Sequence, residues 1–161
     1  MEKTVIAKQV LEKLKNDLIR TIKQRDEAQQ EANSHVGAME SRYDTFKEEA
    51  QYLVSGCNKQ IEKLNKDIDI LTSFIMNSPA LKKKMETVEA GTLITVIKNN
   101  MEEYFLLLPV GGGSEIITDK KTIRIITLLT PLAKALLHKG CETITLSVDD
   151  DSHTITIINI E

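Results

Sequence analysis

Two carboxylate residues in the first half of the chain have the types and spacing for metal chemistry. Glu40 and Asp44 are four residues apart, so they share one face if that stretch is helical. Carboxylate oxygens are ligands that Mg²⁺ prefers. Arg42 and Tyr43 lie between them. Stabilisation of a helix start is the structural role that two such carboxylates can have.

Other residues with chemical potential lack the partners that a site needs. His138 and His153 have no serine or cysteine arranged as a nucleophile, which disfavours a hydrolase. Residues 111–113, three glycines, and residues 149–151, three aspartates, each join two expected strands. A flexible loop and a polar turn are therefore favoured over a nucleotide loop and a calcium site.

Composition sets the class of protein. The 161 residues are 28% charged and 41% hydrophobic with a net charge of −3, which excludes a disordered chain and a strongly basic nucleic-acid binder. No apolar run reaches the ~18 residues of a membrane span, and the N-terminus lacks the apolar stretch of a secretory signal. Cys57 and Cys141 fit no metal or redox spacing, so we expect a cytoplasmic protein.

Long helices must position residues 40–44. Aromatic residues are only 4% of the chain and tryptophan is absent, which argues against a large conventional core. Apolar residues instead recur every three or four positions in two runs: Ala7, Leu11, Leu14, Leu18 and Ile22, then Phe46, Ala50, Leu53, Cys57, Ile61, Leu64, Ile68, Leu71 and Ile75. Two helices of roughly 30 residues with such narrow stripes bury them by folding back as an antiparallel coiled coil. This arm would be roughly 45–50 Å long, with residues 40–44 near its turn.

Charge is distributed unevenly along the predicted arm. Residues 1–25 carry seven basic and three acidic side chains, whereas residues 26–49 carry two basic and seven acidic ones. An acidic tip on a thin arm suits a cation or a passage lined by basic groups. Solvated helix faces are the alternative interpretation.

The second half of the chain predicts a different domain. Asn77-Ser78-Pro79 ends the second helix, which gives domains 1–78 and 79–161. Thr130-Pro131 opens a short helix over 132–138, and Gly140 ends it. Alternating residues predict strands over 91–97, 103–108, 122–127, 142–148 and 154–160. A strand meander with one short helix behind a helical hairpin is an α+β arrangement.

Two segments carry a resemblance to a known family. Residues 130–140, Thr-Pro-Leu-Ala-Lys-Ala-Leu-Leu-His-Lys-Gly, resemble the Ser-Pro-Leu-Ala-Arg-Ala-Leu-Leu-Gly-Lys segment of the bacterial Gre transcript-cleavage factors. Tyr43 and Lys47-Glu48-Glu49 resemble the start of that family's second arm helix, and residues 104–109 are similar to a divergent branch of it. The resemblance covers nearly the whole chain. It implies a coiled-coil arm followed by a C-terminal domain with the fold of FK506-binding prolyl isomerases (FKBP-like).

The resemblance also implies a partner and a mode of action. Gre factors put the arm into the secondary channel of RNA polymerase and dock the C-terminal domain at the channel mouth. The docking residues would then be Pro131, Leu132, Lys134 and Lys139. Acidic tip residues of the family help to hold Mg²⁺ at the polymerase active site. The chain would be no enzyme itself, with no cofactor of its own, no small-molecule substrate and contact with nucleic acid only through the elongation complex.

The sequence departs from the family at the tip. Counting back from Tyr43, the acidic pair of the family falls on Val36 and Met39, which cannot bind Mg²⁺. Glu40 and Asp44 are the nearest carboxylates and would hold Mg²⁺ only within the polymerase complex. The alternative is an arm that enters the channel and inhibits or competes. The sequence leaves this choice, the oligomeric state and the roles of His35 and Cys141 open.

Two functions from other classes compete with this interpretation. A prolyl isomerase of this fold needs a pocket walled by aromatic rings, and residues 79–161 offer only Tyr104 and Phe105, which we expect in the core. A plain coiled-coil adaptor would have a symmetric seam and no charge gradient. Both are therefore disfavoured.

Overall fold

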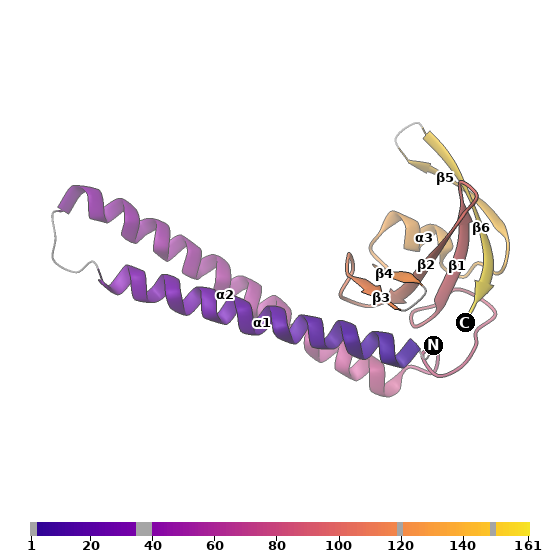
Figure 1. Ribbon diagram of the computed structural model, residues 1–161, viewed down its shortest axis with the longest axis horizontal. Helices are drawn as coiled ribbons and strands as arrows, with labels where there is room; N and C mark the ends of the chain where they lie inside the picture. Colours follow the sequence, from indigo (N-terminus) through magenta and orange to yellow (C-terminus); the bar gives the residue numbers. More distant parts are fainter. Residues whose placement is uncertain (1–2, 35–39, 119–120, 149–150) are drawn as a thin grey trace. The chain divides into compact units, whose positions relative to one another are not determined.

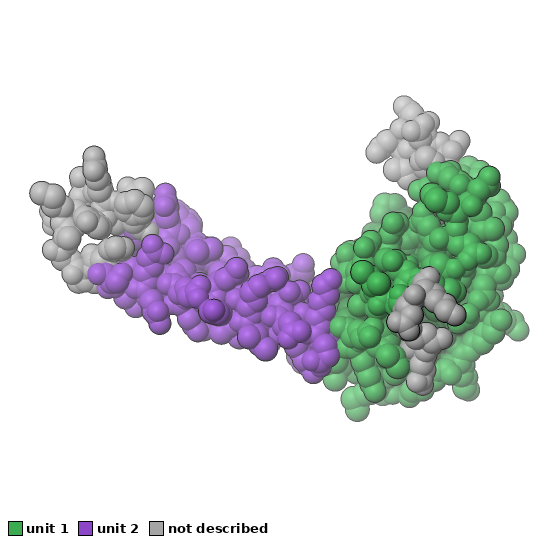
Figure 2. Space-filling model, in the orientation of Figure 1, with its two compact units in different colours: residues 1–11, 70–161 green, residues 12–69 purple. Residues whose placement is uncertain are grey.

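The chain forms two long helices, a mixed six-stranded sheet and one short helix, as a computed structural model shows (Figure 1). The structure describes residues 3–34, 40–118, 121–148 and 151–161, with the backbone alone for 40–46, 146–148 and 151–153. Two compact units are formed, one by residues 12–69 and one by residues 1–11 with 70–161 (Figure 2). The expected α+β class is confirmed. Within the described ranges, no helix is long and apolar enough to cross a bilayer.

The helical arm has the seven-residue spacing of a coiled coil. Helix α1 (Lys3–Ser34) and helix α2 (Glu40–Asn77) lie side by side (Figure 1). In each helix one row of buried residues recurs every seven positions: Ala7, Leu14, Thr21 and Ala28 in α1, and Ala50, Cys57, Leu64 and Leu71 in α2. A strict seven-residue period keeps one narrow seam turned toward a partner helix. The expected helical hairpin is therefore confirmed.

The seam of α2 passes through Val54 rather than Leu53. Leu53 is 55% exposed, whereas Val54 is half-buried. Val54 begins a second row of half-buried residues with Ile61 and Ile68, each seven apart. The sequence expectation for Leu53 was wrong because spacings of three and of four both fit a local apolar pattern, whereas the seven-residue repeat fixes the choice.

The sheet has the order β3-β4-β2-β1-β6-β5. Its strands are β1 (Leu93–Lys98), β2 (Met101–Leu108), β3 (Glu115–Ile117), β4 (Thr122–Thr127), β5 (Thr143–Val148) and β6 (Asp151–Ile160). Neighbours are antiparallel except β2 and β4, which are parallel from Tyr104↔Ile123 to Leu108↔Thr127. The five expected strands are present. The three-residue β3 was missed, and its insertion as an antiparallel partner of β4 is what makes β2 and β4 run in the same direction.

One face of the sheet and the short helix α3 (Pro131–Leu136) form a continuous core. Ala133 and Leu136 of α3 are fully buried. Phe105 is 4% exposed in the same cluster, which confirms its expected place. The cluster consists of Val88, Ile94, Val96, Phe105, Leu107, Ile126, Ala133, Leu136, Ile155, Ile157 and Ile160. α3 is thus fixed mainly by these two side chains, with Leu132 packed against the same cluster, while Pro131 and Lys134 are exposed.

The first turn of α1 is tied to the segment that follows α2. The Nζ of Lys3 donates hydrogen bonds to the carbonyl oxygens of Ala80 and, at 2.6 Å, Lys83. Thr4 Oγ1 donates to the carbonyl oxygen of Leu81 at 3.3 Å. Lys3 is 7% exposed, and burial lowers the pKa of its ammonium group while the charge of Glu161 partly opposes the shift.

Candidate functional site

At the arm tip, residues 40–44, for which the sequence predicts a role at a metal ion, have a helical backbone. α2 begins at Glu40, so Glu40 and Asp44 lie one turn apart, with Arg42 and Tyr43 between them. The side chains of these four residues lie outside the described part of the structure, as do Val36, Met39 and His35 altogether. Their proposed role at a metal therefore stays a prediction. Among the side chains that the structure describes, no cluster of three or more His, Cys, Asp or Glu could hold a metal ion.

The acidic part of the arm next to the tip is solvent-facing. Glu31, Glu48 and Glu49 are exposed. On α1, Asp26 pairs with the adjacent Arg25 at 2.6 Å. Exposed pairs of this kind are worth at most ~1 kcal/mol, so they leave the carboxylates available to another charged surface.

The short helix α3 is capped in the way its sequence predicts. Thr130 is the N-cap, and its Oγ1 accepts a hydrogen bond from the backbone N–H of Ala133 at 3.3 Å while donating to the carbonyl of Thr127 at 2.9 Å. Pro131 occupies the first helical position, where its missing N–H costs nothing. The helix ends at Leu136, two residues before the sequence expectation.

The turn after α3 requires a left-handed residue, and His138 supplies it. His138 has φ of 62°, a conformation that favours glycine because a Cβ crowds the carbonyl. The backbone N–H of His138 donates to the carbonyl of Val88 at 2.9 Å, and the N–H of Val88 donates to the carbonyl of Lys139 at 2.9 Å. These paired bonds hold the turn. The expectation that His138 lies in the last helical turn and that Gly140 ends the helix was wrong.

The four expected docking residues divide into two groups. Pro131 and Lys134 are exposed on the outer side of α3. Leu132 instead packs against the core cluster, and Lys139 pairs with Glu142 at 3.5 Å. The burial of Ala133 and Leu136 determines the places of the three helical residues, because residues three or four apart share a helix face, whereas Lys139 lies beyond the end of α3.

Two exposed leucines adjoin the outer side of α3 and were missed in the sequence. Leu128 is 39% exposed and Leu129 is 82% exposed, in the turn between β4 and the N-cap. We call Leu128, Leu129, Pro131 and Lys134 the α3 surface. An apolar pair beside a cation is the composition of a protein-binding surface. The available sequence signal was that two consecutive leucines fall in a turn, where polar residues are usual.

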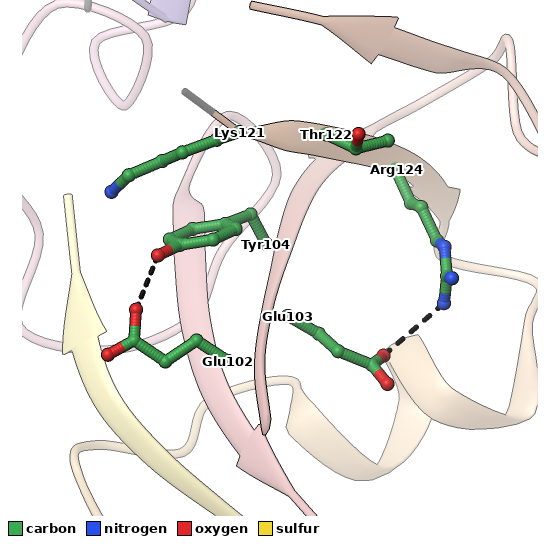
Figure 3. Close-up of a pocket in the computed structure, with 6 residues that line it drawn as sticks. All are labelled: Glu102, Glu103, Tyr104, Lys121, Thr122 and Arg124. Carbon is green, nitrogen blue, oxygen red and sulfur yellow. Dashed lines mark hydrogen bonds and ion pairs between the residues drawn. The ribbon is translucent and has the colours of Figure 1, made fainter.

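A polar pocket of about 290 Å³ lies where the parallel strands β2 and β4 begin (Figure 3). Tyr104 donates a hydrogen bond to Glu102, and the Nζ of Lys121 lies 4.1 Å from the centre of the tyrosine ring. Arg124 bridges Glu103 at 3.3 Å and Glu115 at 3.2 Å. The hydrogen bond to Glu102 raises the pKa of the Tyr104 phenol.

This pocket differs from a prolyl-isomerase site. Tyr104 is the one aromatic residue among its six lining residues. Glu103 pairs with Arg124, and Glu102 and Lys121 both contact Tyr104. The expectation that Tyr104 lies in the core was wrong. Alternate residues of a strand face opposite sides of the sheet, so Tyr104 and Phe105 cannot share one core face.

Comparison with known proteins gives structural neighbours alone. No protein-family model and no curated protein matches the chain. The crystal structure of GreA factor homolog 1 (Gfh1) of Thermus thermophilus is similar with 12% identity and a TM-score of 0.36, over 94% of this chain and 94% of that chain. A structure of the transcription factor Gfh1 is similar with 18% identity and a TM-score of 0.37, over 93% of this chain and 92% of that chain.

Proposed function

We propose that the chain is a Gre-like regulator of transcription elongation that binds RNA polymerase. The arm enters the secondary channel, and the C-terminal domain docks at the channel mouth through the α3 surface. The chain changes what the polymerase does and catalyses no reaction itself. Because its partner is RNA polymerase, it works in the cytoplasm.

The observation that carries this proposal is the fit between the Gre-like segment and the backbone at His138. The family segment has glycine where this chain has His138, and that residue adopts the left-handed conformation that glycine favours. The other positions of the segment also have a physical role here, since Thr130 caps α3 and Ala133 and Leu136 are buried. Residues 130–140 therefore resemble the Gre segment in amino-acid sequence, and the backbone at His138 has the conformation that the glycine of that segment favours.

The dimensions and charge of the arm suit a narrow passage. α1 has 32 residues, which corresponds to about 48 Å. Exposed acidic residues such as Glu31, Glu48 and Glu49 are concentrated beside the tip. Carboxylates concentrated at one end favour entry into a channel lined by basic groups.

The tip favours channel binding without strong cleavage stimulation. Val36 and Met39 provide no oxygen ligand at the positions of the acidic pair of the family. Glu40 and Asp44 would be the residues that hold a Mg²⁺ shared with the polymerase active site. A channel-binding competitor or inhibitor is therefore the second candidate function.

Competition for RNA polymerase tests the proposal. The chain should displace a labelled Gre factor from core polymerase in a concentration-dependent way. Leu129→Glu combined with Lys134→Glu should weaken that competition at least tenfold, because both changes alter the α3 surface. Met101→Glu is the matched control, since Met101 is 64% exposed and lies outside that surface. Absence of competition at saturating protein would exclude the shared channel.

The competition assay, combined with transcription assays of elongation and of cleavage of backtracked RNA, separates the two modes of action at the tip. Glu40→Ala combined with Asp44→Ala should leave binding to polymerase intact. If the two carboxylates act at the active site, the double variant loses any effect on elongation or on cleavage of backtracked RNA. Strong cleavage that survives the double substitution would show that other residues hold the metal.

A further inference from the structure

The two edge strands of the sheet differ in how well they are protected against pairing with a strand of another chain. β3 forms one edge with three residues, and its Glu115 pairs with Arg124 at 3.2 Å. β5 forms the other edge with six residues, Thr-Ile-Thr-Leu-Ser-Val, which include no charge and no proline. Natural proteins usually block a long edge strand with such residues, because its free N–H and C=O groups accept another strand. β5 lacks this protection.

The pairing with β6 defines which backbone groups of β5 are free. The N–H of Ile157 donates to the carbonyl of Glu142 at 2.9 Å, and the register continues as Thr143↔Thr156. In an antiparallel pair the residues that bond inward alternate with those that bond outward. Even-numbered residues of β5 therefore bond to β6. Thr143, Thr145 and Ser147 direct their N–H and C=O groups to the open edge.

We propose that the β5 edge binds the β5 edge of a second copy of this chain, antiparallel about Thr145. This register places Thr143 opposite Ser147 of the partner subunit and Thr145 opposite its own equivalent, and it allows about six main-chain hydrogen bonds. It also places Ile144 opposite Leu146 of the partner subunit. Hydroxyl-bearing residues therefore pair with hydroxyl-bearing residues, and apolar residues pair with apolar residues. The strand is complementary to itself.

Charge selects the antiparallel direction. The strand is followed by three aspartates at 149–151 and preceded by Lys139. Antiparallel pairing puts the C-terminal ends of the two β5 strands at opposite ends of the joint, about 20 Å apart, which is beyond the ~8 Å screening length of physiological salt. A parallel pair would instead put both strand ends, and the aspartates that follow them in the sequence, at the same end of the joint.

The association should be weak and concentration-dependent. One edge-to-edge strand pair buries less surface than the ~1,200 Å² typical of stable dimers. We expect dissociation constants in the micromolar to millimolar range, so the dimer forms at high local concentration. This inference is independent of the proposed partner of the arm.

A pair of lysine substitutions tests the inference in the full chain. Thr145 and Thr154 are both exposed and lie opposite each other in register, but only Thr145 is on the open edge. Thr145→Lys places two charges opposite each other in the dimer, whereas Thr154→Lys places them about three strand spacings apart. By sedimentation equilibrium, the wild type and Thr154→Lys should dimerise alike, and Thr145→Lys should stay monomeric. A wild type that is monomeric at millimolar concentration, or a Thr145→Lys chain that dimerises like the wild type, overturns the inference.

Disulfide trapping tests the register directly. Cys141 is exposed and is first replaced by serine. Thr145→Cys then faces its own equivalent across the joint at about 5.5 Å between Cα atoms, a separation that a disulfide can bridge. Mild oxidation should give a covalent dimer. The Thr154→Cys control should not cross-link, and equal cross-linking of both variants would refute the register.

Discussion

His138 shows how one residue can bear a conformation that its type disfavours. Its φ of 62° costs a non-glycine residue about 1–2 kcal/mol. The reciprocal backbone bonds between Val88 and residues 138–139 keep the turn in place, because breaking it would leave these groups without partners. The tertiary contacts of the turn, rather than the preference of histidine, therefore determine this backbone.

Replacing His138 should stabilise the protein. His138→Gly removes the Cβ and should raise the free energy of unfolding by about 0.5–1 kcal/mol, since the relief of strain exceeds the extra entropy of an unfolded glycine. His138→Ala is the control, because it keeps the Cβ and should give no gain. Urea unfolding of the three chains measures the difference. A glycine variant no more stable than the alanine variant would show that the turn is unstrained.

At the scale of elements, two glycines differ in whether the structure has room for a side chain. Gly56 lies in the middle of α2, and a Cβ built on it meets nothing within 4 Å. Gly91 precedes β1 with φ of 98°, and a Cβ there would lie 3.0 Å from the Cβ of Ala80 and 3.1 Å from the N of Leu81. Gly56 is thus a weak point of a helix, whereas Gly91 permits a close approach of two segments.

Alanine at these two positions should change stability in opposite directions. Gly56→Ala should raise the free energy of unfolding by about 0.5–1 kcal/mol, because alanine loses less backbone entropy in a helix. Gly91→Ala should lower it by more than about 1 kcal/mol, because both the left-handed φ and the crowding disfavour a side chain. Thermal unfolding followed by far-UV circular dichroism compares the two variants with the wild type. A loss of stability in Gly56→Ala would mean that the helix needs a bare backbone there.

At the scale of the whole molecule, Lys3 links residues at opposite ends of the first half of the chain. Its hydrogen bonds to Ala80 and Lys83 join the start of α1 to the segment beyond the end of α2. These contacts place residues 1–11 in the same compact unit as the sheet. A single buried ammonium therefore helps to hold the two helix ends together.

Removing Lys3 should weaken the protein in a pH-dependent way. Lys3→Met leaves two carbonyl oxygens without their donor and should lower the free energy of unfolding by about 1–3 kcal/mol. Burial holds the pKa of Lys3 below its ordinary value of 10.5, so between the two values the unfolded chain binds more protons. The wild-type advantage over Lys3→Met should then increase as the pH rises toward 10.5. Denaturant titrations across alkaline pH measure it, and an advantage that falls with pH would contradict the assignment.

By itself, the sequence determined the elements whose pattern is local. The apolar spacing predicts both arm helices, and Pro79 predicts the end of α2, which the structure places at Asn77. Alternation predicts five of the six strands. Thr130 and Pro131 predict the start of α3, since capping depends only on residues within one turn. The role of residues 40–44 at a metal stays a prediction from the sequence, and the structure adds only that their backbone is helical.

Only the tertiary structure decided how these elements meet. In α2, Val54 rather than Leu53 lies in the seam. In the sheet, β2 and β4 pair in parallel. Within β2, Tyr104 lines a polar pocket while Phe105 is part of the core. It also exposed Leu129 and packed Leu132 of the expected docking set against the core. These outcomes depend on residues far apart in the chain. Local periodicity cannot specify them, because a strand or helix face is defined by whatever packs against it.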